Sequence, residues 1–217
     1  MNTADAVPSH RKPYHHGALH SALIEASIAL AREGGPDRVI LREAARAAGV
    51  SHSAAYRHFT DRDALLAEVS RHARSELAAQ MRRRVKRAKD PLQRLQAVGA
   101  AYIDFALTQP GLFRTAFISH PATSRNDDDV PRNATEAGSH PDTAEPFEIL
   151  GEVLDQAQAA GLLDPDRRPG AEIAAWSAVH GLATLLLDGP LPTAPADIRF
   201  SLDRVLELIG RGLLNTA

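Results

Sequence analysis

Residues 40–66 read ILREAARAAGVSHSAAYRHFTDRDALL, and this stretch decides the fold. Apolar residues recur at helical spacing over 41–48, which predicts a short helix with one apolar face. Gly49 then permits a tight turn because it has no Cβ atom. Ser51 is a favourable N-cap for a second short helix over 52–59. Two short helices around a glycine turn are typical of a DNA-reading helix-turn-helix.

The second helix can divide its residues between core and solvent. Ala55 and Phe59 lie four residues apart and can both face inward. The polar side chains of His52, Ser53, Tyr56 and Arg57 can then face outward. A helix-turn-helix also occurs in ordinary helical bundles, so the turn alone leaves both interpretations open.

The residues that follow the turn favour DNA binding. Gly49-Val50-Ser51, Tyr56 and His58-Phe59 match the pattern GVS-x-x-x-x-Y-x-HF-x-x-K, with Arg62 in place of the lysine. From Tyr14 to Leu66 the chain therefore resembles the DNA-binding domain of the tetracycline-repressor (TetR) family. Arg62 keeps the positive charge of the residue that it replaces.

The resemblance implies a role for each matched position. DNA contacts are expected from Arg42, Ser51, His52, Ser53, Ala54, Tyr56, Arg57, His58 and Arg62. Among these, Tyr56, His58 and Arg62 correspond to phosphate contacts, which orient a protein on DNA. His52, Ser53 and Ala54 occupy the base-facing turn, and Arg42 reaches a base or the backbone. Because few of these are polar base readers, DNA shape is expected to contribute to specificity.

Two positions depart from the family pattern. Ile40 and Leu41 stand where many members have threonine, so Asp37 is an alternative helix cap. Ala54 has no hydrogen-bond donor and can offer only a methyl contact, for instance to thymine.

The charge is distributed unevenly. Net charge is only −2 over 217 residues. Residues 1–90, however, hold 16 Lys/Arg and 10 Asp/Glu, whereas residues 91–217 hold 9 and 17. A basic N-terminal part suits a chain with one end on DNA. The chain has no cysteine and no long apolar run, so we expect no disulfide, no membrane span and a cytoplasmic location.

The remaining pattern predicts an all-α fold. Residues 1–13 are expected to form a disordered basic arm, 14–66 the helix-turn-helix domain, and 67–217 an effector-binding and dimerisation domain. Further helices are predicted over these ranges: 17–32, 62–89, 91–108, 112–118, 147–160, 169–187 and 196–214. Residues 119–146 are polar and rich in Pro and Asp, which predicts a flexible loop.

The larger domain carries Trp176-x-x-x-His180-Gly181, which resembles the C-terminal domain of one TetR subgroup. Trp176 and His180 lie on one helix face. They either line a ligand cavity or form a packing anchor and a hydrogen-bonded core histidine. Gly181 is explained by close approach of another helix. Candidate cavity residues are Tyr102, Phe105, Phe113, Phe117, Phe147, Leu150, Trp176 and His180, which indicates a largely apolar ligand.

The last two helices resemble those that form the dimer interface in this family. Their apolar surface exceeds what a two-helix hairpin could bury, and a two-fold axis suits a pseudo-palindromic DNA site. The expected interface residues are Gly181, Leu182, Leu185, Leu186, Leu202, Val205, Leu206, Ile209 and Leu213.

Three functions remain open. The first is a homodimeric repressor released from its operator by a small molecule, without a cofactor, catalytic residue or metal. The second is a ligand-blind or activating DNA-binding regulator. The third is an enzyme with a metal on His15, His16 and His20, for which no catalytic motif gives support.

Overall fold

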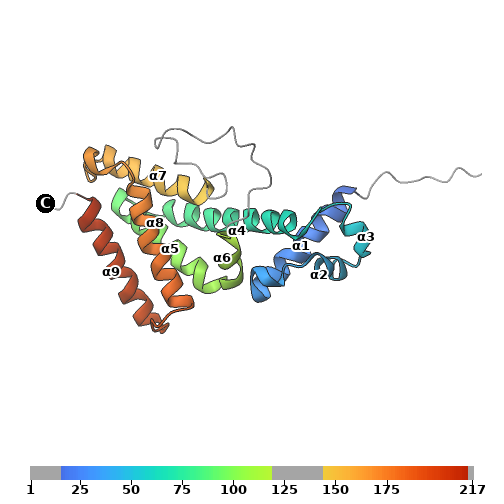
Figure 1. The fold of residues 1–217 in the computed structure, drawn as a ribbon. Helices are drawn as coiled ribbons and strands as arrows, with labels where there is room; N and C mark the ends of the chain where they lie inside the picture. Colours follow the sequence, from blue (N-terminus) through green and yellow to red (C-terminus); the bar gives the residue numbers. More distant parts are fainter. Residues whose placement is uncertain (1–15, 119–143, 215–217) are drawn as a thin grey trace, which may run out of the picture.

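A computed structural model describes residues 16–118 and 144–214, and all regular elements in these ranges are helical (Figure 1). The all-α prediction is therefore confirmed. The predicted arm and residues 119–143 of the predicted loop lie outside the described residues. The α-helices are α1 (His16–Gly34), α2 (Leu41–Ala47), α3 (His52–Ala55), α4 (Arg62–Val85), α5 (Pro91–Thr108), α6 (Pro110–Ala116), α7 (Ala144–Ala159), α8 (Ala171–Leu187) and α9 (Pro195–Leu213).

We call α1–α3 with the first turns of α4 the head, and the rest of α4 with α5–α9 the body. Figure 1 shows α3 at one end of the molecule and α9 at the other, with α4 running between them. Helix α4 has 24 residues, and at 1.5 Å per residue it spans about 36 Å. It buries Leu65 and Leu66 in the head and Leu77 and Met81 in the body, so one rigid element belongs to both parts.

Side-chain caps fix the helices of the head. Ser51 Oγ accepts a hydrogen bond from the Ala54 amide at 3.2 Å, as predicted for its N-cap position. At the start of α4, Asp61 accepts from the Ala64 amide at 2.8 Å, and this hydrogen bond lowers the pKa of Asp61. Helix α2 begins after Ile40 without a side-chain cap. The alternative cap Asp37 is therefore wrong, because this residue lies in a separate 3-10 turn, η1 (Pro36–Arg38).

The second helix of the motif is shorter than predicted. α3 ends at Ala55, and the chain turns over residues 56–58. There the amides of Arg57 and His58 donate to carbonyls only three residues back, which tightens the backbone beyond an α-helix. Ala55 and Phe59 are nonetheless buried, as predicted. Helix α4 likewise ends at Val85 rather than near Lys89, and α7 begins at Ala144 rather than Phe147.

Head and body meet where α6 approaches α1. A Cβ atom added to Gly111 would lie 2.1 Å from the Ala31 carbonyl oxygen and 2.9 Å from that of Arg32. Only glycine permits this approach without a shift of backbone. The other end of α6 is held by α4, because Ser70 and the buried Arg74 each donate to the Ala116 carbonyl oxygen at 3.0 Å.

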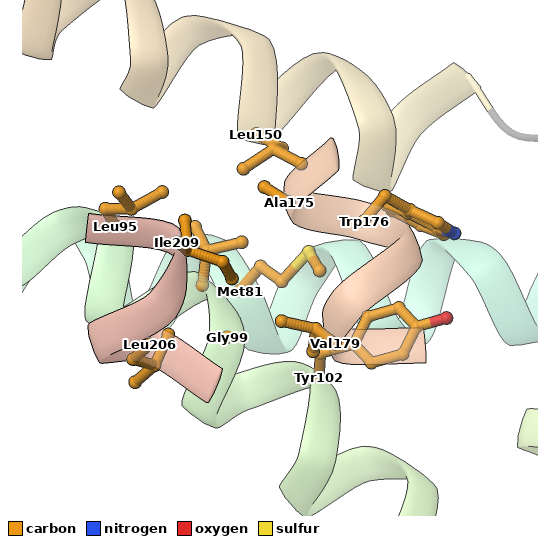
Figure 2. Close-up of a pocket in the computed structure, with 11 residues that line it drawn as sticks. Met81, Leu95, Gly99, Tyr102, Leu150, Ala175, Trp176, Val179, Leu206 and Ile209 are labelled. Carbon is orange, nitrogen blue, oxygen red and sulfur yellow. The ribbon is translucent and has the colours of Figure 1, made fainter. Parts of the chain in front are cut away.

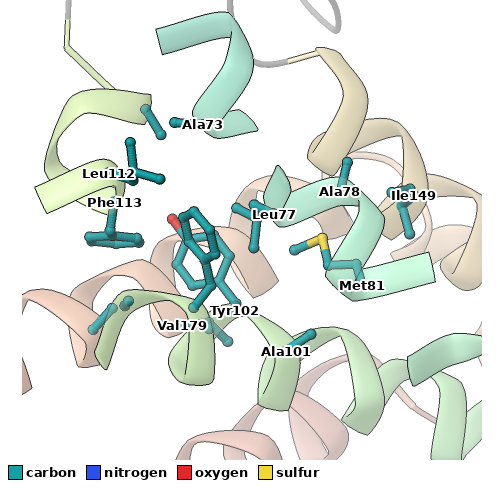
Figure 3. Packing of buried hydrophobic residues seen from close by; sticks show 14 of the residues in the cluster. Ala73, Leu77, Ala78, Met81, Ala101, Tyr102, Leu112, Phe113, Ile149 and Val179 are labelled. Atoms are coloured by element: carbon teal, nitrogen blue, oxygen red, sulfur yellow. The ribbon is translucent and has the colours of Figure 1, made fainter. Parts of the chain in front are cut away.

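The body encloses the larger part of the apolar core. Leu77 and Met81 of α4 pack among residues of α5, α7 and α8, including Tyr102 and Val179 (Figure 3). Helix α8 is apolar nearly all round, but it is not buried all round within the single chain, because Ile173 is 64% exposed and Leu185 46% exposed. No helix within the described ranges is long and apolar enough to span a membrane.

Candidate DNA-binding surface and apolar cavity

The predicted DNA-contacting residues gather on and around α3, at the tip of the head. Arg42, Ser51, His52, Ser53, Tyr56, Arg57 and Arg62 are exposed, while Ala54 and His58 are half-buried. Tyr56 is 51% exposed although it is a large aromatic residue. The ring of His52 meets it edge-on, with centroids 4.7 Å apart. This contact orients two outward-facing side chains toward the same side of the head.

Arg62 has a structural role in addition to its predicted one. Its Nε atom donates to the Val39 carbonyl oxygen at 2.9 Å, and its NH2 group donates to that of Pro36 at 2.7 Å. The guanidinium thereby ties the start of α4 to the loop between α1 and α2. A phosphate contact by Arg62 stays a prediction. The side chain would make this contact in addition to the two hydrogen bonds.

Two of the described histidines of the head, His20 and His58, pack against other rings. His20 stacks on the buried ring of Phe59, with centroids 4.8 Å apart. His58 lies edge-on to His20 at 6.2 Å. Over the described residues, no three His, Cys, Asp or Glu side chains come together as a metal site. His15 and the side chain of His16 lie outside the described part of the chain.

An apolar cavity lies inside the body, between α4, α5, α7, α8 and α9. About 20 Å³ is open to the centre of a water-sized sphere, which is room for about one water molecule. Figure 2 shows aliphatic residues at one end and the rings of Tyr102 and Trp176 at the other. The cavity is lined by Met81, Leu95, Val98, Gly99, Tyr102, Leu150, Ala175, Trp176, Val179, Leu206 and Ile209.

Tyr102 is the centre of an aromatic cluster beside this cavity. Its ring contacts those of Phe113, Phe117 and Trp176, with centroids 5.4, 5.9 and 5.0 Å away. Phe147 extends the cluster through Trp176, at 5.7 Å. Trp176, Phe117 and Phe147 are half-buried. The cluster thus connects the interior of the body with its surface.

One polar pair lies within this aromatic cluster. The Tyr102 hydroxyl and His180 Nδ1 are 2.7 Å apart and share a hydrogen bond. Burial raises the pKa of Tyr102 well above its usual value and lowers that of His180. Both effects favour the uncharged forms, since burial disfavours ionised groups. The pair is therefore neutral and supplies hydrogen bonding without charge.

The predicted cavity residues divide into three groups. Tyr102, Leu150 and Trp176 line the cavity. Phe113, Phe117, Phe147 and His180 belong to the adjoining aromatic cluster. Phe105 is fully buried and does not line the cavity, because it lies one turn further along α5. A role of Phe105 in a ligand pocket stays a prediction.

Sequence reasoning missed most of the aliphatic wall of the cavity. Met81, Leu95 and Val98 carry no signal that separates them from ordinary core residues. A mid-helix glycine is such a signal, and Gly99 has a packing reason to be there. A Cβ atom at this position would lie 2.9 Å from Leu206 Cδ2.

The predicted dimer residues are mostly turned inward. Leu182, Leu186 and Ile209 are only 4%, 4% and 7% exposed within the single chain, and Leu206 and Ile209 line the cavity. Leu202, Val205 and Leu213 are half-buried against the chain's own core. Only Leu185 and Gly181 of the predicted set are exposed.

A different set of apolar side chains faces solvent on α8 and α9. Ile173 and Leu185 on α8, with Phe200 and Leu208 on α9, are between 46% and 67% exposed. We call these four residues the outer apolar face. A Cβ atom placed on Gly181 would meet no atom of another helix within 4 Å, so the close helix approach expected there is not made by the described residues of this chain.

Two family descriptions match the chain. "Bacterial regulatory proteins, tetR family" matches residues 23–69, and "Tetracyclin repressor-like, C-terminal domain" matches residues 95–209. No curated protein sequence matches it.

Solved structures share the fold. A Rhodococcus sp. RHA1 protein of unknown function is 30% identical with a TM-score of 0.71, over 94% of this chain and 100% of that one. A TetR family transcription regulator from Marinobacter aquaeolei VT8 is 18% identical, with a TM-score of 0.61 over 92% and 97%. RolR, crystallised with resorcinol, is 16% identical, with a TM-score of 0.61 over 89% and 88%.

The two family matches agree with the division into head and body seen in the structure. The helix-turn-helix, its exposed α3 and the helical body are the parts that this family combines. The chain belongs to the tetR family of bacterial regulatory proteins and is a DNA-binding transcription regulator.

Proposed function

We propose that the protein is a homodimeric repressor that a small, largely apolar ligand releases from a pseudo-palindromic operator. The observation that carries the proposal is the course of α4. This helix contributes Leu65 and Leu66 to the head and Met81 to the wall of the cavity. A ligand that moves the cavity wall would therefore move an element on which α3 depends. Release requires only that the ligand binds the non-DNA form more tightly.

The outer apolar face supports a dimer. Large apolar side chains that remain exposed on a single chain commonly mark a protein interface. Gly181 lies exposed on the same helix as Ile173 and Leu185, so a partner helix could come close to the backbone there. Two recognition helices related by a two-fold axis could then read successive major grooves.

The apolar cavity supports a ligand. Its room for about one water molecule implies that a ligand must displace its walls, which is what coupling to α4 requires. RolR holds resorcinol in its crystal. We take from this only that the shared fold admits a small molecule.

The first test is binding of the purified protein to DNA that flanks its own gene, followed by fluorescence anisotropy. The assay uses about 150 mM salt and nonspecific competitor, because weak phosphate contacts dominate at low salt. Specific, salt-sensitive binding at one or two dimers per site is expected. Failure to bind either this DNA or any sequence selected from random DNA would refute the proposal. An increase in transcription on operator binding would favour the activating alternative.

The dimer is tested by Phe200→Glu, which puts a charge on the outer apolar face. Sedimentation should then show a monomer, and operator affinity should fall at least about tenfold because the second half-site is lost. The control is Arg199→Glu, which puts the same acidic side chain at an exposed neighbouring position on α9. A Phe200→Glu protein that remains a dimer would show that the interface lies elsewhere.

A further inference from the structure

The cavity and the aromatic cluster adjoin each other at Tyr102 and Trp176, which belong to both, and the two regions differ in chemistry. At the aliphatic end lie Leu95, Leu206 and Ile209, opposite the rings of Tyr102 and Trp176 (Figure 2). The Tyr102–His180 pair lies in the aromatic cluster at the other end. A ligand that occupies the cavity and extends into the cluster would therefore combine an apolar tail, a flat ring and one hydrogen-bonding group.

The polar pair retains hydrogen-bonding capacity whichever partner carries the shared proton. If the Tyr102 hydroxyl donates to His180 Nδ1, the tyrosine oxygen can still accept and Nε2–H can donate. If Nδ1–H donates instead, the tyrosine O–H can donate and Nε2 can accept. One donor and one acceptor remain in both cases. A hydroxyl group, which also donates and accepts, is the complementary ligand group.

The walls select against charge. Every atom exposed in the cavity wall is apolar, because neither the Tyr102 hydroxyl nor the Trp176 indole N–H faces the cavity. An ionised carboxylate in such surroundings would lose its hydration without gaining a counter-charge, which is costly. Burial also lowers the pKa of His180, so the imidazole does not supply a positive charge at neutral pH.

The rings select for a flat molecule. Phe113, Phe117 and Trp176 surround Tyr102 with centroids 5.0–5.9 Å away and steep interplanar angles for Phe113 and Trp176, 89° and 74°. Aromatic groups prefer such edge-to-face and offset contacts. Because Phe117 and Trp176 are only half-buried, they can turn aside to admit another ring.

We infer that the effector is a neutral alkylphenol, with its hydroxyl on the Tyr102–His180 pair and its alkyl group in the aliphatic end of the cavity. The inference rests on the proposed ligand-responsive function and specifies its ligand. Tyr102 and His180 are then the residues that select for a hydroxyl group. Leu206 and Gly99 bound the space for the alkyl group, because the lack of a Cβ atom at Gly99 lets Leu206 approach the backbone of α5.

The chain contains its own reporter for this site. Trp176 is its single tryptophan and lies in the cavity wall. The probes are 4-ethylphenol, ethylbenzene and 4-ethylbenzoate, which share a skeleton and differ in one group. Titration of the full-length protein should give saturable quenching of Trp176 by 4-ethylphenol. Ethylbenzene should bind at least about tenfold more weakly, as expected for one lost hydrogen bond in a buried site. 4-Ethylbenzoate should give no saturable change.

Tyr102→Phe tests the assigned pair, because it removes the hydroxyl and keeps the ring. The preference for 4-ethylphenol over ethylbenzene should fall from about tenfold to about twofold or less. Thr108→Val is the matched control: it deletes a hydroxyl from the same helix, where Thr108 donates to the Asp104 carbonyl oxygen at the surface. Circular dichroism shows whether each variant folds. If Tyr102→Phe does not fold, the comparison of the three probes on the wild-type protein still tests the inference.

Three results would overturn the inference: equal binding of 4-ethylphenol and ethylbenzene, tighter binding of 4-ethylbenzoate, or no saturable binding of any probe. Operator binding is measured separately by anisotropy, so its loss would count against the proposed function alone. 4-Ethylphenol could bind with the expected selectivity and yet leave the operator complex intact. That result would support the inferred ligand class and contradict the proposal that this ligand releases the protein from DNA.

Discussion

The head and the body carry their functional side chains in opposite places. In the head these side chains stand on the surface of α3, where Tyr56 is 51% exposed. In the body they line an interior, where Tyr102 is only 2% exposed. An exposed recognition surface needs a correct local turn and a few outward residues. An enclosed site needs several distant helices to pack correctly, so its identity depends on tertiary structure.

The largest effect that tests this difference is expected from Phe59→Ala in the head. Phe59 is 4% exposed and stacks on His20. Its loss should lower the free energy of unfolding of the head by about 3–5 kcal/mol, as for other buried aromatic residues. Operator binding should be lost while Trp176 in the body still reports ligand. Denaturant unfolding is followed by circular dichroism, which reports the helices of both parts, and by Trp176 fluorescence, which reports the body alone.

Ile40→Ala is the control for this prediction. Ile40 is 43% exposed in the same head, so its truncation should cost less than about 1 kcal/mol. Coincident loss of both signals in Phe59→Ala would mean that head and body unfold as one unit. The difference between head and body would then concern where their functional side chains lie and not their separate stabilities.

An intermediate effect is expected from Arg62→Ala. The guanidinium donates to the carbonyl oxygens of Val39 and Pro36. Because the side chain is 42% exposed, their loss should cost about 1–2 kcal/mol of unfolding free energy and not more. Arg38→Ala, which removes an exposed guanidinium from the same loop, should cost less.

The salt dependence of DNA binding separates the two roles of Arg62. A lost phosphate contact lowers the slope of log affinity against log salt by about 1. A purely structural role leaves this slope unchanged while thermal stability falls. Tyr56→Phe offers the comparison, since a phosphate contact there should weaken binding to all sequences alike. A change confined to one base position would contradict that assignment.

The smallest effect concerns pH and the body. Burial lowers the pKa of His180 below its ordinary value of 6.5. Its neutral form therefore stabilises the fold above about pH 6.5, and this contribution is lost as pH falls through the lowered pKa. His180→Gln should show a shallower loss of unfolding free energy between about pH 7 and about pH 5. If the wild type and His180→Gln lose unfolding free energy with pH at the same rate, His180 has the same pKa in the folded and unfolded states.

The sequence predicted the head more completely than the body. Gly49, Ser51 and Phe59 act within a few residues of each other, so their spacing predicts the turn, the cap and the inward face. The length of α3 was overestimated, because spacing does not reveal that the backbone tightens after Ala55. In the body, Tyr102 and Trp176 line one cavity and His180 bonds to Tyr102, and their role in ligand binding stays a prediction.

The two faces of α9 show why the rest of the body was harder to predict. Leu206 and Leu208 have the same side chain and lie two positions apart. Leu206 lines the cavity, whereas Leu208 is 67% exposed. Which apolar stripe turns inward depends on how α9 docks against α5 and α8, and local spacing does not contain that information.

The contact at Gly111 limits how this architecture can be recombined. The atoms that a side chain there would meet are the carbonyl oxygens of Ala31 and Arg32, which are present whatever the sequence of α1. No compensating substitution in a transplanted head could relieve the collision. A chimaera can join this head to the C-terminal domain of another family member. That domain must then carry a glycine at the position equivalent to Gly111 in α6, or the two domains must meet at a different angle.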